Sequence, residues 1–146
     1  MKKKILFLLF LFCTINCFSQ FSKTHYIPPL TCSTSLYAED QYLYISTPSL
    51  ASVNFKIIAN GGSVINGTVN STSPYRYYIG TGANTQLFTN STGIVSNHGY
   101  IIEAEDLIYV SARVNAGINK DGGYNHAGGI VSKGNSALGT TFRLGA

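Results

Sequence analysis

The feature that most constrains the fold is a series of short runs in which apolar and polar residues alternate. In the run 53–57 the odd positions Val53, Phe55 and Ile57 are apolar, and residues 107–114 repeat the pattern. A period of two gives a strand one buried face and one wet face. No stretch after residue 19 keeps a helical period over about ten residues. The chain is therefore expected to be all-β, with no helix longer than about two turns.

Turn chemistry divides these runs into antiparallel strands. Asn60-Gly61 and Asn66-Gly67 both match a hairpin turn, because type I′ turns need positive φ at both central residues. Residues 52–70 are thus expected to form a meander, and residues 103–106 a short acidic turn. Pro28-Pro29 excludes residues 25–30 from a central strand and indicates an extended entry. The expected strands are 41–46, 52–59, 63–65, 68–70, 75–79, 86–89, 100–103, 107–114, 129–132 and 140–144.

These strands predict an antiparallel β-sandwich-like domain, with a fragment of a β-propeller-like repeat as the alternative. The last strand, 140–144, is followed by no turn or polar tail before Ala146. A strand left without its neighbour would expose an unpaired edge. We therefore expect residues 20–146 to be the front part of a longer domain.

The N-terminus has the pattern of an export signal. Lys2, Lys3 and Lys4 precede an unbroken apolar run over residues 5–12, which is too short to span a bilayer as a helix. Small residues favour cleavage after Ser19, which makes residues 1–19 a signal peptide and leaves no transmembrane segment in the mature chain. A lipid anchor on Cys17 is the alternative, although Asn16 is a poor residue before it.

Removing residues 1–19 changes the charge and the cysteine count. Seven Lys or Arg then face six Asp or Glu, so the net charge is near +1 and no nucleic-acid partner is expected. Cys32 becomes the single cysteine, and an internal disulfide is impossible. Cys32 is interpreted either as a small buried apolar residue or as a half-cystine whose partner lies beyond Ala146.

Catalytic and metal-binding signatures are missing from the sequence. It contains no G-x-S-x-G, H-E-x-x-H, phosphate-binding loop, C-x-x-C or EF-hand pattern. His25, His98 and His126 are far apart along the chain, so no metal site and no cofactor are expected. The acidic cluster at 103–106 allows a glycosidase interpretation, but a solvated turn is favoured. We expect a protein without enzymatic activity.

The candidate binding residues are aromatic or lie in a glycine-rich loop. Tyr75, Tyr77 and Tyr78 form the densest tyrosine patch, and tyrosine suits contact surfaces because it joins an apolar body to a polar tip. Tyr124 and His126 lie within the glycine-rich segment 121–129, which could present them to a ligand. The structural alternative for the tyrosine patch is ordinary cross-strand pairing. The structural alternative for the glycine-rich segment is a long hairpin connection.

Several segments together resemble a known kind of secreted protein. They are Cys17-Phe18-Ser19-Gln20 followed by residues 21–30 (FSKTHYIPPL), then residues 42–48 (YLYISTP), 101–104 (IIEA), 127–134 (AGGIVSKG) and 137–140 (ALGT). This resembles the N-terminal region of large surface proteins of gliding bacteria exported by the type IX pathway, which is similar to the IgG Fc-binding-protein N-terminal domain. The resemblance implies an extracellular location and a longer domain. It offers no binding-residue motif, so immunoglobulin binding is not carried over.

The sequence as a whole predicts a secreted or cell-surface module that binds or adheres without catalysis. Its partner would be an extracellular protein or a glycan. The alternative is an accessory β-domain of a secreted carbohydrate-active enzyme, and a purely structural spacer is a third possibility.

Overall fold

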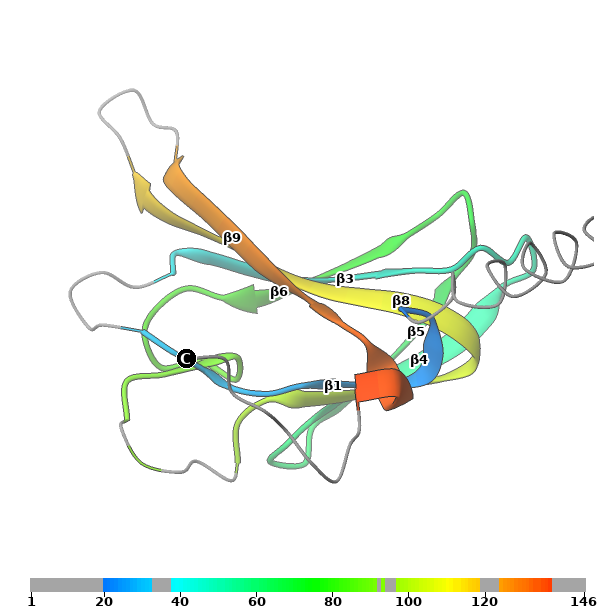
Figure 1. Ribbon diagram of the computed structural model, residues 1–146, viewed down its shortest axis with the longest axis horizontal. Helices are drawn as coiled ribbons and strands as arrows, with labels where there is room; N and C mark the ends of the chain where they lie inside the picture. Colours follow the sequence, from blue (N-terminus) through cyan, green and yellow to red (C-terminus); the bar gives the residue numbers. More distant parts are fainter. Residues whose placement is uncertain (1–19, 33–37, 92, 94–96, 119–123, 138–146) are drawn as a thin grey trace, which may run out of the picture.

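The computed structural model describes residues 20–32, 38–91, 93, 97–118 and 124–137 (Figure 1). Within these ranges the chain is all-β and antiparallel apart from one two-stranded ladder, which confirms the expected fold class. No helix in them is long and apolar enough to cross a membrane. The elements are β1 (Ser22–Ile27), β2 (Leu30–Thr31), β3 (Asp40–Ser46), β4 (Val53–Ala59), β5 (Val64–Val69), β6 (Tyr75–Gly80), β7 (Phe88–Thr89), β8 (Tyr100–Ile118), β9 (Tyr124–Ser132) and the 3₁₀-helix η1 (Gly134–Ala137).

The 19-residue strand β8 organises the main sheet. Its first part pairs with β1 on one side and β4 on the other, and its second part pairs with β3 and β9. β5 extends the sheet beyond β4, and β6 extends it beyond β3. The sheet therefore has a β4 half (β5-β4-β8-β1) and a β3 half (β6-β3-β8-β9). It curls into a half-barrel through which β8 runs from end to end (Figure 1).

The expected acidic turn at residues 103–106 is wrong, because these residues continue β8. Thr24 pairs with Glu103, whereas Ser22 pairs with Ile108, so β8 carries extra residues in this stretch and bulges. A bulge bends a strand and increases its twist. The acidic segment is thus the bend at which β8 passes from the β4 half into the β3 half.

The second Asn-Gly pair is also not a turn. Asn66 and Gly67 lie inside β5, paired with Lys56 and Phe55 of β4. The Phe55 ring lies across Gly67 and occupies the space that a side chain there would need. The first pair does lie in a turn, where Ala59 N–H donates to the Ser63 carbonyl over 2.9 Å. The positive φ falls on Gly62 (109°) rather than on Asn60 and Gly61, so the turn is not the expected type I′. Residues 52–70 therefore form one hairpin rather than a meander.

The core lies between the two halves of the curled sheet. Edge-on ring contacts join the halves: Phe55 meets Tyr75 with ring centroids 4.9 Å apart, and Tyr77 meets Tyr100 at 6.3 Å. Burial raises the pKa of the Tyr100 phenol, and the neighbouring Tyr77 adds to this rise. The alternation read from the sequence sets the buried faces, which include Leu43, Ile45, Val53, Phe55, Ile57, Ile102, Ile108, Val110 and Ala112.

The N-terminal segment is more regular than the expected extended entry. β1 is a paired strand against β8, and it ends at Ile27, just before Pro28. Its His25 is completely buried. His25 Nε2 lies 2.9 Å from the Ile108 carbonyl and 3.2 Å from the Ser22 carbonyl, so this nitrogen carries the proton. Nδ1 is buried without a partner, and the ring is therefore held neutral.

Burial makes His25 a source of acid sensitivity. Desolvation lowers the pKa of His25 below 6.5, and backbone hydrogen bonds with Ile108, Ser22 and Ser132 only partly oppose it. The unfolded chain then binds a proton that the folded chain does not, so stability is complete above about pH 6.5 and falls below it. We expect the free energy of unfolding to fall as the pH drops below about 6.5, at up to about 1.4 kcal/mol per pH unit.

Urea unfolding at several pH values tests this. His25→Gln, which can still donate to both carbonyls but does not titrate, should flatten the profile over that range. His98→Gln is the matched control, because His98 is only half-buried and its ring bonds to the Asn97 and Asn84 side chains. A His25→Gln profile as steep as that of the unaltered protein would contradict the assignment.

Candidate binding face

The three neighbouring tyrosines of β6 do not share one face. Tyr75 and Tyr77 are half-buried and pack against the core, where their rings meet Phe55 and Tyr100. Tyr78 points outward and is 50% exposed. Successive side chains alternate across a strand, so adjacent tyrosines such as Tyr77 and Tyr78 must separate. Of the predicted patch, only Tyr78 lies on the outer surface.

Tyr78 instead joins a row of tyrosines on the outer face of the β3 half. Its ring centroid lies 5.2 Å from that of Tyr42, which lies 6.0 Å from that of Tyr44. Tyr42 and Tyr44 alternate along β3 with the fully buried Leu43 and Ile45, and this alternation turns both tyrosines outward. The row crosses from β6 onto β3, and its neighbouring rings are tilted against each other by 47° and 54°.

Two arginines lie against this aromatic row. The guanidinium carbon of Arg76 is 5.3 Å from the ring centroid of Tyr42, and that of Arg113 is 5.6 Å from the centroid of Tyr44. Both arginines are exposed. Each contact of this kind stabilises an exposed site by about 0.5–1 kcal/mol and orients the guanidinium. The face therefore presents planar rings and oriented positive charge together.

Beside the row, the surface is hollowed into a trough of about 480 Å³ that runs over β8 to β9. Tyr42 and Tyr44 form one wall and Val131 stands on the other side, while Ser111 and Gly129 lie in the floor. A Cβ atom at Gly129 would lie 2.7 Å from the Ala112 carbonyl oxygen, so the position has no room for a larger residue and the trough remains deep there. We call this hollow the outer trough. Its lining residues are Tyr42, Tyr44, Ser111, Ala112, Arg113, Val114, Asn115, Ala127, Gly128, Gly129, Ile130 and Val131.

The predicted residues Tyr124 and His126 lie on β9, in the same strand as the trough floor. His126 pairs with Ala116 and Tyr124 with Ile118, so their backbone continues the ladder beyond the trough. Segment 121–129 is thus partly strand, and its residues 121–123 lie outside the described part of the chain. So does the expected strand 140–144.

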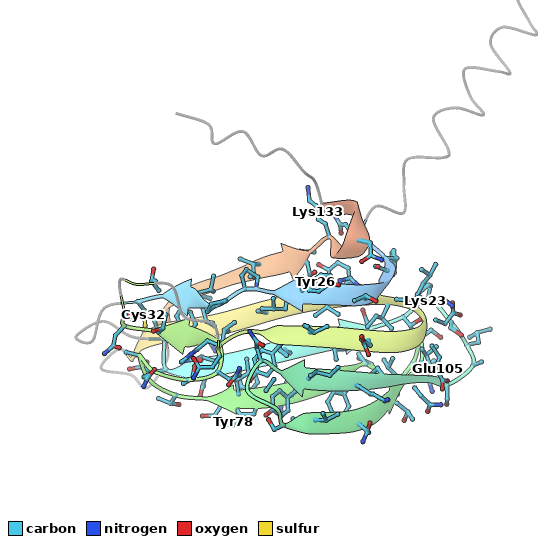
Figure 2. All side chains as sticks on the ribbon, turned by 90° about the horizontal axis from the view of Figure 1, so that it is seen from below. Lys23, Tyr26, Cys32, Tyr78, Glu105 and Lys133 are labelled. Carbon is cyan, nitrogen blue, oxygen red and sulfur yellow. The ribbon has the colours of Figure 1, made fainter. Side chains whose placement is uncertain are left out.

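A second hollow, of about 620 Å³, lies on the outer face of the β4 half. Glu105, one of its lining residues, is held by two hydrogen bonds. Asn54 Nδ2 donates to the Glu105 carboxylate over 2.8 Å, and Lys23 Nζ donates to the Glu105 carbonyl over 2.8 Å. Lys56 pairs directly across from Glu103. Figure 2 shows Lys23 and Glu105 at one end of the molecule, well away from Tyr78.

No metal site takes shape in the described ranges, where no three His, Cys, Asp or Glu side chains gather. Cys32 is half-buried against the core, with its Sγ 3.8 Å from the Ala83 carbonyl. That position suits its interpretation as a small apolar residue.

Most residues of the outer trough and of the tyrosine row beside it were not predicted from the sequence. Tyr42, Tyr44, Arg76 and Arg113 were not candidates, although alternation already placed Arg113 opposite the apolar face of its strand. The missing signal was the pairing of β3 with both β6 and β8, because Tyr42 pairs with Tyr78 on one side and with Arg113 on the other.

Comparison with known proteins adds little. No protein-family model and no curated protein matches the chain. A solved structure described as the crystal structure of Thermotoga maritima 1070 is similar, with a TM-score of 0.45 and 11% identity over 76% of this chain and 92% of that one. A likeness at this level carries no argument about function.

Proposed function

We propose that this protein is a non-catalytic module that acts outside the cell and binds a carbohydrate chain in the outer trough. The observation that carries the proposal is the row of Tyr78, Tyr42 and Tyr44 beside a hollow with a polar floor. The core does not need these rings on this face, because Leu43 and Ile45 already fill the buried side of β3. Export is supported by the lysines and the apolar run within residues 1–19.

A carbohydrate fits this geometry better than a purely apolar ligand. A sugar ring has flat C–H faces, which pack on aromatic rings, and a rim of hydroxyls, which needs hydrogen-bonding partners. The trough offers both, with Tyr42 and Tyr44 in its wall and Ser111 and Asn115 among its lining residues. Pockets of this kind combine apolar walls with a few polar groups that fix orientation.

One observation bears on the alternative that this chain is an accessory domain of a carbohydrate-active enzyme. Hydrolysis of a glycosidic bond uses two carboxyl groups on either side of that bond. Glu103 and Glu105 line the hollow on the outer face of the β4 half instead, and Glu105 is bonded to Asn54. The arrangement favours binding without catalysis, whether the chain acts alone or beside an enzyme.

Affinity electrophoresis through gels containing soluble polysaccharides tests the proposal. The panel contains dextran, xylan, polygalacturonate and chondroitin sulfate. We expect at least one to retard the protein, and the double variant Tyr42→Ala/Tyr44→Ala to lose at least about tenfold in affinity. Tyr26→Ala is the matched control, because Tyr26 is 43% exposed but lies on β1. The absence of retardation by the whole panel, or equal loss in the control, would refute the proposal.

A further inference from the structure

We infer that the outer trough, together with the tyrosine row that forms its wall, selects anionic polysaccharides, whose uronate or sulfate groups bind Arg113 in the trough lining and Arg76 on the β6 side of the row. This inference rests on the proposed function and adds the chemical class of the ligand. Both guanidiniums lie against the tyrosines that would stack the sugar rings, at 5.3 and 5.6 Å from the ring centroids. An acidic group carried by a stacked sugar would therefore lie within reach of one of them.

Charge is distributed unevenly over the two outer faces. In the β3 half, Arg76 and Arg113 flank the middle of β3, and Asp40 sits at its first residue. In the β4 half, Glu103 and Glu105 line the second hollow with Lys56. With a mature net charge near +1, attraction of an anion depends on this local arrangement rather than on the whole molecule.

Arginine is suited to this role in a way that lysine is not. Its planar fork donates two parallel hydrogen bonds to a carboxylate or sulfate. Stacking on Tyr42 and Tyr44 holds each fork in place before the ligand arrives, which reduces the entropy lost on binding. The outer trough and its wall thus have the two elements that an acidic polysaccharide requires: outward-facing tyrosine rings and oriented guanidiniums beside them.

Pairs of polysaccharides that differ in their acidic groups isolate the effect of the ligand's charge on binding. Binding of the purified full chain to dextran sulfate is compared with dextran, and binding to polygalacturonate with its methyl ester, at low and physiological salt. We expect each anionic member to bind at least about tenfold more tightly than its neutral partner. The sulfate and uronate arms show which acidic group the site prefers.

Variants then test whether the effect arises at the outer trough and the tyrosine row beside it. Arg76→Gln and Arg113→Gln should each reduce affinity for the preferred anionic chain by about five- to tenfold and leave the affinity for its neutral partner unchanged. Lys56→Gln removes a positive charge from the outer face of the β4 half and should have no effect. Equal loss in Lys56→Gln would mean diffuse attraction, and equal binding of single-stranded poly(dT) would mean that any polyanion suffices. Either result overturns the inference.

The outcomes for the two proposals are separable. If neutral and anionic chains bind equally and Tyr42→Ala/Tyr44→Ala still abolishes binding, the selection for anions is wrong and the trough remains a carbohydrate site. If no polysaccharide binds, the proposed function fails as well.

Discussion

Replacing Gln41 with methionine is expected to lower the free energy of unfolding by about 3 kcal/mol. Gln41 is fully buried at the start of β3. Its Nε2 donates to the Ala38 carbonyl over 2.9 Å and to the Gly82 carbonyl over 2.8 Å, and its Oε1 accepts from Thr85 Oγ1 over 2.6 Å. Methionine has similar volume but leaves these groups without that partner, and a buried unsatisfied polar group costs about 1–3 kcal/mol.

Urea unfolding measures this loss. Gln86→Met is the matched control, because Gln86 Nε2 also donates to two carbonyls, those of Asn97 and Gly99, but the side chain is only half-buried. Water can replace its bonds, so we expect a loss below about 1 kcal/mol there. Equal losses in the two variants would show that the Gln41 network is not a special determinant of stability.

Replacing Gly67 with alanine is expected to cost about 2–3 kcal/mol, although alanine normally improves on glycine within a strand. The new methyl group would meet the Phe55 ring. That ring is 2% exposed and is held by the edge of Tyr75, so it has little room to move. The cost should be small in a Phe55→Leu background, because leucine does not reach across β5.

A double-mutant cycle over Phe55→Leu and Gly67→Ala tests this coupling, which we expect to be about 2 kcal/mol. Gly128→Ala in β9 is the control, because a methyl group there would lie 3.6 Å from Val114 Cγ2, an ordinary contact. That variant should change stability by less than about 0.5 kcal/mol. Additive losses from the Phe55 and Gly67 changes would disprove the clash.

The local alternation of apolar and polar residues determined much of the fold. Alternation in the segments that became β3 and β4 fixed which residues are buried, because strand side chains point to opposite faces by geometry alone. The Asn60-Gly61 pair marked the position of the first turn, although the positive φ falls on Gly62. The absence of any helical period predicted the all-β architecture, which the structure confirms.

Tertiary structure decided whether two ambiguous segments became turns or parts of strands. Asn66-Gly67 could have been a turn, but the pair lies within β5, opposite Lys56 and Phe55 of β4, with the Phe55 ring packed across Gly67. The acidic run in β8 could have been a turn, and only its partners on both sides made it a bend in one long strand.

The candidate site depended on tertiary structure most of all. Each segment by itself showed outward-facing residues, but nothing in it showed which strands are neighbours. Pairing of β3 with β6 and β8 brought Tyr42 beside Tyr78 and Arg113. Strand order is set by contacts between residues far apart in sequence, whereas the side of the sheet that a residue faces is set by its immediate neighbours. The sequence alone therefore determined which faces are buried, and the tertiary structure determined which residues meet on the face that remains exposed.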